Sequence, residues 1–92
     1  MSYTVIWQHK IVDAVAAIYL QAREAGRNTD AITQAVARID SSLLENPASR
    51  GESRNRYERI LIMSPLSVHF EVYEDERIVL VTSVRYHLPR HP

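Results

Sequence analysis

The sequence predicts a two-layer α+β domain in which two N-terminal helices pack on one face of a mainly antiparallel sheet. Two consecutive segments have the apolar spacing of amphipathic helices, and segments before and after them alternate in the manner of strands. Glycine, proline and acidic residues separate these segments. The expected order is therefore β-α-α-β-β-β. With 92 residues, of which 46% are hydrophobic and 24% charged, the chain has the composition of one globular domain over residues 1–92.

The first half of the chain contains one strand and two helices. Residues 3–8 alternate and are rich in aromatic and β-branched side chains, which predicts a strand. Residues 10–25 form an amphipathic helix that ends at Gly26. A second helix begins at Asn28 or Thr29, either of which can cap it, and ends at Asn46-Pro47. The apolar stripes are Ile11, Val15, Ile18, Ala22 and Ala25 in the first helix and Ile32, Ala35, Val36, Ile39 and Leu43 in the second.

The second half of the chain contains three strands. Residues 48–55 lack an apolar period and are expected to form an exposed loop. Residues 56–63 and 66–73 alternate as strands on either side of Ser64-Pro65. An acidic turn at 74–76 precedes a last strand at 78–86, whose apolar run at 78–81 favours an interior position. On this basis, the helix stripes are expected to pack against Val68, Phe70, Val72, Ile78 and Leu80.

Composition excludes several classes of protein. The chain has no cysteine, which excludes disulfides and thiolate zinc sites. It shows no leader pattern and no apolar run of about 18 residues, so a cytoplasmic protein with no membrane partner is expected. The net charge is zero, which gives no overall attraction to nucleic acid, although Lys10 is the only lysine among eleven basic residues. This arginine bias favours phosphate recognition, and a GC-rich genome explains it equally well.

The histidines do not form a metal motif. His87 and His91 are four residues apart, but Pro89 between them prevents the helix that would bring the two side chains together. We therefore expect neither a metal ion nor a cofactor.

Fragments spread over nearly the whole chain follow one another with a characteristic spacing; they are residues 3–7, 13–19, 43–47 with Gly51, 59–61, 65–72 and 79–86. In this order they resemble the RelE/ParE family of type II toxin–antitoxin toxins. The resemblance implies a sheet of order 1-4-3-2, a cognate antitoxin as partner, and a homodimer or a toxin–antitoxin heterotetramer as the assemblies to consider. RelE-like members cut ribosome-bound mRNA, whereas ParE-like members inhibit DNA gyrase without being nucleases. A degenerate member without toxicity is the third interpretation.

The end of the last strand supplies the first candidate residues. Metal-free RNA cleavage needs a proton acceptor, a proton donor and a cation for the phosphate. Arg85, Tyr86 and His87 resemble the Arg-Tyr-His ending of YoeB-like members of the family, in which the histidine takes part in catalysis. Alternation places Arg85 and His87 on one face and Tyr86 on the other. A polar strand end that runs into a tail is the alternative.

The loop after the second helix supplies a carboxylate and a basic patch. Glu52 occupies a loop in which YoeB-like members also carry a glutamate, so it is a candidate base. The surrounding arginines could hold phosphate groups of RNA or pair with an acidic antitoxin. They are Arg50, Arg54, Arg56 and Arg59.

One position departs from the pattern of active relatives. RelE-like and YoeB-like nucleases carry an arginine in the third strand, where Ser67 stands here. His69 lies on the same face two residues further on and is a candidate RNA-binding replacement. A half-buried strand histidine without a function is the alternative for His69.

Overall fold

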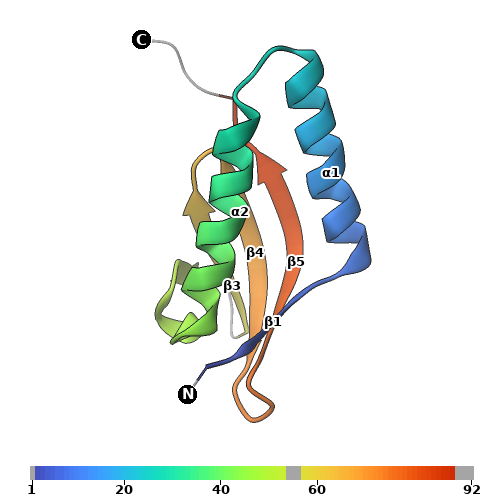
Figure 1. Cartoon of the computed structure of the whole chain (residues 1–92). Helices are drawn as coiled ribbons and strands as arrows, with labels where there is room; N and C mark the ends of the chain where they lie inside the picture. Colours follow the sequence, from blue (N-terminus) through green and yellow to red (C-terminus); the bar gives the residue numbers. More distant parts are fainter. Residues whose placement is uncertain (1, 54–56, 89–92) are drawn as a thin grey trace.

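The structure, a computed structural model that describes residues 2–53 and 57–88, has two layers (Figure 1). The α+β fold predicted from the sequence is confirmed, with a short strand β2 and a 3-10 turn η1 added between the helices and the last three strands. The elements in chain order are β1 (Thr4–Trp7), α1 (His9–Glu24), α2 (Thr29–Leu44), η1 (Pro47–Ser49), β2 (Glu52–Ser53), β3 (Glu58–Met63), β4 (Leu66–Tyr73) and β5 (Ile78–Tyr86).

The sheet has the strand order β1-β5-β4-β3-β2. β1 runs parallel to β5, and the remaining neighbours are antiparallel. For the four strands predicted from the sequence, this is the order 1-4-3-2. The interior position expected for the last strand is confirmed, because β5 lies between β1 and β4.

Both helices lie on the same side of the sheet, α1 along β5 and α2 across β4 and β3 (Figure 1). Gly26, which has a φ of 71°, follows α1, and this left-handed conformation suits a helix end. Asn28 caps α2, and its side chain accepts a hydrogen bond from the Ala31 N–H at 3.2 Å. In the described part of the chain, neither helix combines the length and apolar content that crossing a membrane requires.

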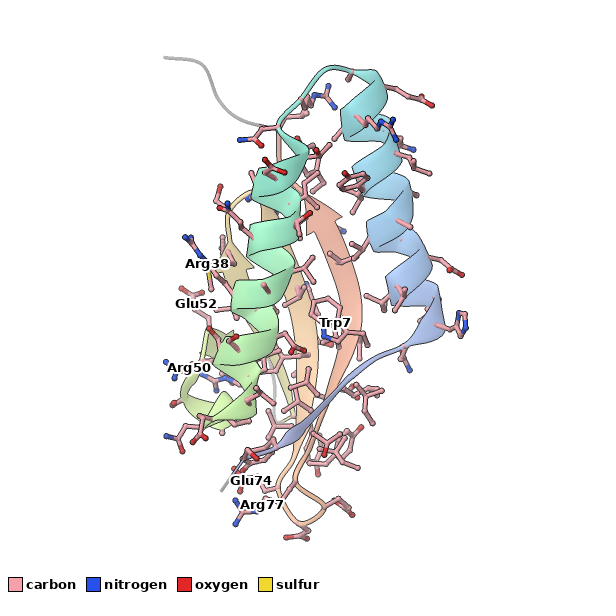
Figure 2. The ribbon with its side chains drawn as sticks, in the orientation of Figure 1. Trp7, Arg38, Arg50, Glu52, Glu74 and Arg77 are labelled. Atoms are coloured by element: carbon pink, nitrogen blue, oxygen red, sulfur yellow. The ribbon has the colours of Figure 1, made fainter. Side chains whose placement is uncertain are left out.

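The core lies between the helices and the sheet and is centred on Phe70, which is fully buried in β4. Burial of its apolar neighbours is the main favourable contribution to the stability of the layers. Trp7 lies between the two helices (Figure 2), where its Nε1–H donates to Asp40 Oδ1 of α2 at 2.9 Å. The buried apolar residues are Ile11, Ala22, Ile32, Ala35, Ile39, Leu43, Leu66, Val68, Phe70, Val79 and Val81.

One part of the predicted packing is wrong. The core residues of β5 are Val79 and Val81, and not Ile78 and Leu80. The reason is a β-bulge, because Phe70 pairs with Val81 whereas the preceding residue of β4 pairs with Ser83, leaving one extra residue in β5. The bulge shifts the alternation of β5 by one position. Regular alternation that is correct for the C-terminal half of β5 therefore assigns the residues of its N-terminal half to the wrong face.

Candidate active site on the open face of the sheet

The open face of the sheet is the face away from the helices, and polar side chains gather on it. Residues in register on neighbouring strands share a face, so the pairs His69 with Ser83 and Ser67 with Arg85 place four polar side chains together. The bulge in β5 is what brings Ser83 and Arg85 onto this side. The apolar side chains on the same face are Ile6, Ile60, Ile62, Ile78 and Leu80.

Ser67 and His87 contact each other on the open face, where Ser67 Oγ lies 2.7 Å from His87 Nε2. The backbone N–H of His87 donates to the Pro65 carbonyl at 2.7 Å, which holds the residue just beyond the end of β5. Ser67 is only 8% exposed, whereas His87 is exposed. Ser67 is therefore placed to orient the imidazole, which leaves Nδ1 as the ring nitrogen that can meet a ligand.

Arg85 is exposed and lies directly across from Ser67 in the β4–β5 pair. Opposed residues in antiparallel strands have Cβ atoms about 5 Å apart, so the guanidinium group emerges beside the Ser67–His87 pair. No hydrogen bond or ion pair engages this guanidinium group within residues 2–53 and 57–88. The chain thus carries an arginine one strand away from the position at which the resemblance places one.

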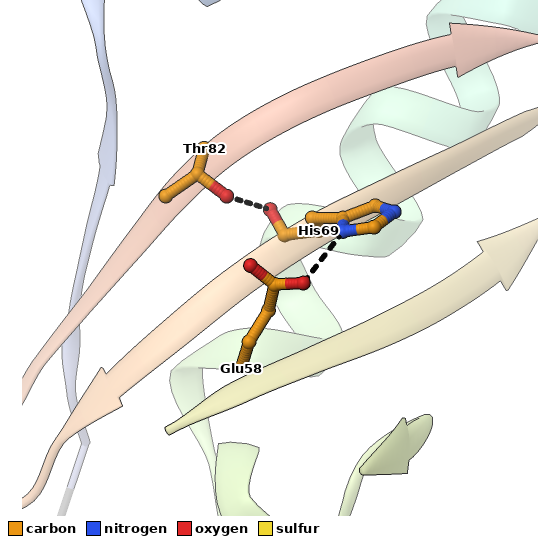
Figure 3. A network of polar contacts seen from close by, with 3 residues as sticks. All are labelled: Glu58, His69 and Thr82. Carbon is orange, nitrogen blue, oxygen red and sulfur yellow. Dashed lines mark hydrogen bonds and ion pairs between the residues drawn. The ribbon is translucent and has the colours of Figure 1, made fainter. Parts of the chain in front are cut away.

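His69 and Glu58 form a second pair on the open face (Figure 3). His69 Nδ1 lies 3.0 Å from Glu58 Oε1, and the two side chains are 32% and 30% exposed. Thr82 Oγ1 donates to the His69 carbonyl at 3.3 Å from the neighbouring strand. Reasoning from the sequence singled out His69 but missed Glu58, because their contact depends on the register of β3 with β4 and no motif signals it.

Glu52 and Tyr86 lie apart from His87. Glu52 belongs to the edge strand β2, in register with Ile60, and is three strands away from β5. Neighbouring strands are about 4.8 Å apart, so β2 and β5 are separated by about 14 Å, and Glu52 does not lie next to His87. Tyr86 faces the helices, as alternation predicts, and packs against the core.

Arg50 and Arg59 are engaged with backbone carbonyls on the helix side of the sheet. The Arg59 guanidinium group donates to the carbonyls of Arg50 and Gly51 at 2.7 and 3.0 Å. Arg50 Nε donates to the Ser42 carbonyl at 3.2 Å, near the C-terminal end of α2 (Figure 2), where a cation interacts favourably with the helix dipole. These two arginines therefore anchor the segment that leads to β2. The other members of the predicted basic patch, Arg54 and Arg56, lie outside the described residues.

The pKa of Tyr73, at the end of β4, is raised above its ordinary value. The main cause is the hydrogen bond that its hydroxyl donates to Glu71 Oε1 at 2.8 Å, and the negative charges of Glu71 and Glu76 add to the effect. A phenol with a raised pKa stays protonated near neutral pH. Tyr73 is therefore not a proton acceptor for chemistry at this pH.

Within residues 2–53 and 57–88, no three side chains of the histidine, cysteine, aspartate or glutamate type gather closely enough to hold a metal ion. The polar groups of the open face include two histidines, an arginine, hydroxyls and the carboxylates of Glu52, Glu58 and Glu71. Imidazole and carboxylate groups transfer protons, and the guanidinium and hydroxyl groups can donate hydrogen bonds to an anion.

No protein-family model, curated protein or solved structure matches the chain. Inference about its function therefore starts from the open face.

Proposed function

We propose that the protein is the toxin of a type II toxin–antitoxin pair and acts as an RNA endonuclease that uses no metal ion. One observation carries the proposal. On the open face, a guanidinium group stands directly across from a serine whose hydroxyl lies 2.7 Å from an imidazole, which combines Arg85, Ser67 and His87. The order of elements and strands supports the proposal, because it is the order that the resemblance to RelE/ParE toxins implies.

The chemistry of RNA cleavage accounts for each of the three residues. The phosphate gains negative charge as the 2′-oxygen attacks, and the exposed guanidinium group of Arg85 can bind it through paired N–H donors. Imidazole is the side chain that most often serves as a general acid or base, and His87 supplies one beside Arg85. Ser67 fixes the orientation of that imidazole. Ribosome-bound mRNA is the proposed substrate, because RelE-like toxins act on it.

The antitoxin is proposed to occupy an apolar groove on the opposite side of the molecule. This groove of about 580 Å³ lies between α1 and α2 and includes Trp7, Val15 and Val36. Val12 and Leu20 of α1, 50% and 53% exposed, add apolar surface nearby. Exposed apolar surface of this kind suits the apolar face of a partner segment that folds on binding. Induced expression of the chain without an antitoxin is accordingly expected to arrest growth.

The substitution His87→Gln tests the nuclease proposal. Loss of a general acid or base lowers a rate by about 10² to 10⁴, so the variant should cut a labelled reporter mRNA that much more slowly in a reconstituted translation reaction. Its melting temperature should stay close to that of the wild type, because His87 is exposed and contributes little packing. The new RNA ends identify the chemistry, since metal-free cleavage leaves a 2′,3′-cyclic phosphate and a 5′-hydroxyl.

His9→Gln is the matched control, because His9 is also a histidine and its side chain is 98% exposed on α1, on the other side of the sheet. It should cleave the mRNA at the wild-type rate. A parallel assay of DNA supercoiling by gyrase covers the other toxic activity. Inhibition of gyrase without RNA cleavage would replace the nuclease proposal with a ParE-like one, and failure of both assays together with normal growth would indicate a non-toxic protein.

A further inference from the structure

The Glu58–His69 pair has the geometry of a second proton-transfer group. The carboxylate lies 3.0 Å from His69 Nδ1. A carboxylate accepts a hydrogen bond from the N–H at this position, which leaves the other ring nitrogen, Nε2, with its lone pair. The carbonyl of His69 is also held, by Thr82 Oγ1 at 3.3 Å (Figure 3). Both ends of His69 are therefore fixed, and its basic nitrogen is defined.

The position of this pair relative to His87 matters as much as its geometry. His69 and Ser67 are two residues apart on β4 and share a face, which separates them by about 7 Å along the strand. His87 reaches back to Ser67, at 2.7 Å, so its ring lies near the level of that residue. Arg85, across from Ser67, lies between the level of His69 and the end of β5. The two imidazole groups therefore lie on the same face about one residue pair apart along β4, and Arg85 stands on the neighbouring strand at the level of Ser67.

We infer that His69 and His87 act as a pair on one RNA phosphate, with Glu58 as the residue that positions His69. The inference rests on the proposed nuclease function and names the second proton-transfer group of the same site. In phosphoryl transfer the attacking and leaving oxygens lie roughly in line on opposite sides of phosphorus. A proton acceptor and a proton donor on either side of a bound phosphate meet this requirement.

The step balances without a cofactor. Nε2 of His69 takes the proton from the 2′-hydroxyl, and the 2′-oxygen forms a bond to phosphorus while the bond from phosphorus to the 5′-oxygen breaks. The imidazolium form of His87 gives its proton to that 5′-oxygen. The products are a 2′,3′-cyclic phosphate and a 5′-hydroxyl, and Arg85 binds the charge that develops on the phosphate oxygens.

Other titratable groups face the site from the neighbouring strands. They are Glu52 of β2, Glu58 of β3, Glu71 and Tyr73 of β4, and Arg85 and His87 of β5. Glu52 is two strands away from His69 and Glu71 is the register partner of Glu58, whereas Glu58 contacts His69 itself. An unprotonated base and a protonated acid must be present together, so the cleavage rate is expected to rise and then fall as the pH increases.

The test is the pH profile of single-turnover cleavage of a labelled mRNA positioned on ribosomes, with the wild type, His69→Gln, Glu58→Gln, His87→Gln and the control His9→Gln. His69→Gln should be slower by about 10² to 10⁴ and should lose the rise on the acidic side, because its proton acceptor is missing. In His87→Gln, the cleavage rate should no longer decrease at alkaline pH. Glu58→Gln, which keeps the imidazole, should fall between the wild type and His69→Gln.

Two contrary results have different meanings. A His69→Gln variant that keeps the wild-type rate and both limbs of the profile overturns the inference and leaves the nuclease proposal standing. A wild-type protein that cuts no RNA at any pH contradicts both this inference and the nuclease proposal. If His69→Gln lowers the melting temperature so far that it is not folded, Glu58→Gln decides, because a wild-type profile in that variant contradicts the positioning role.

Discussion

Phe70 is the residue on which the packing of the two layers depends most. It is fully buried at the centre of β4 and is in register with Val81 on one side and Arg59 on the other. The helices cover this side of the strand. Removing its ring leaves a cavity that the neighbouring secondary structure can fill only in part.

We therefore expect Phe70→Ala to lower the free energy of unfolding by about 3 to 5 kcal/mol, a large share of the stability of a small domain. Chemical denaturation followed by the fluorescence of Trp7, the only tryptophan, measures it. Val12→Ala is the matched control, because Val12 is 50% exposed and should cost less than about 0.5 kcal/mol. Equal losses in the two variants would contradict the assignment of the core face of β4.

The residues of the candidate site differ in how far the sequence reveals them. Arg85 and His87 could be predicted to share a face, because they are two positions apart near the end of a strand. Glu58 could not, because its contact with His69 exists only once β3 and β4 are paired in register. The backbone contacts of Arg59 could not be predicted for the same reason, since a cluster of arginines in a sequence does not show which of them are engaged within the fold.

At the scale of the elements, the connection from α2 to β3 depends on Gly51, whose backbone packs closely against β3. Gly51 has a φ of 65°, and a Cβ added there would collide with the Ile60 carbonyl of β3. Gly26 after α1 has a similar φ, 71°, but a Cβ there meets nothing within 4 Å. Both glycines have a positive φ, but only Gly51 also packs closely against a neighbouring strand. Comparing substitutions at the two positions therefore distinguishes these two requirements.

We expect Gly51→Ala to be clearly more destabilising than Gly26→Ala. Both variants force alanine into the left-handed region, at a cost of about 1 to 2 kcal/mol, and only Gly51→Ala adds the collision with β3. The difference in melting temperature between them measures that collision. Equal melting temperatures would show that β2 and its connection move away from β3 at little cost.

The fold could be predicted from the sequence wherever a segment has a long apolar period. The stripes of the two helices and the alternation in β3 and β4 are of this kind, and the expected bounds agree with the structure to within a few residues. β2 has only two residues, Glu52 and Ser53, and therefore has no period to detect. The bulge in β5 could not be predicted either, because Thr82 and Ser83 have no feature that distinguishes them from regular strand residues.

On the scale of the whole molecule, the sheet separates two kinds of surface. The helix side carries the core and the apolar groove between α1 and α2, which includes Trp7 and Val36. The open side carries His69, His87 and Arg85. In the proposed toxin, an antitoxin segment in the groove alone would leave the open face accessible, so inhibition requires the partner to reach around the edge of the sheet as well.

The bulge also means that β5 contains one residue, Thr82, that is not needed for its pairing with β4. Pairing skips this residue, because Val81 and Ser83 are paired with consecutive residues of β4. Deletion of Thr82 would restore regular pairing between β4 and β5, and all the remaining side chains of β5 would stay on their present faces. We expect that variant to lose about 1 kcal/mol of unfolding free energy, mainly from the hydrogen bond to the His69 carbonyl, and to retain more RNA cleavage than a variant in which a paired residue of β4 is deleted.

Deletion of Val68, in β4, is the contrasting case. β4 has no unpaired residue, so the loss would send Ser67 and His69 to opposite faces. Thermal melting and the mRNA cleavage assay on the two deletion variants distinguish them, and a Thr82 deletion as damaging as the Val68 deletion would contradict this reading of the bulge. The sheet should therefore tolerate the loss of one residue at Thr82, the position of β5 that is not paired with β4.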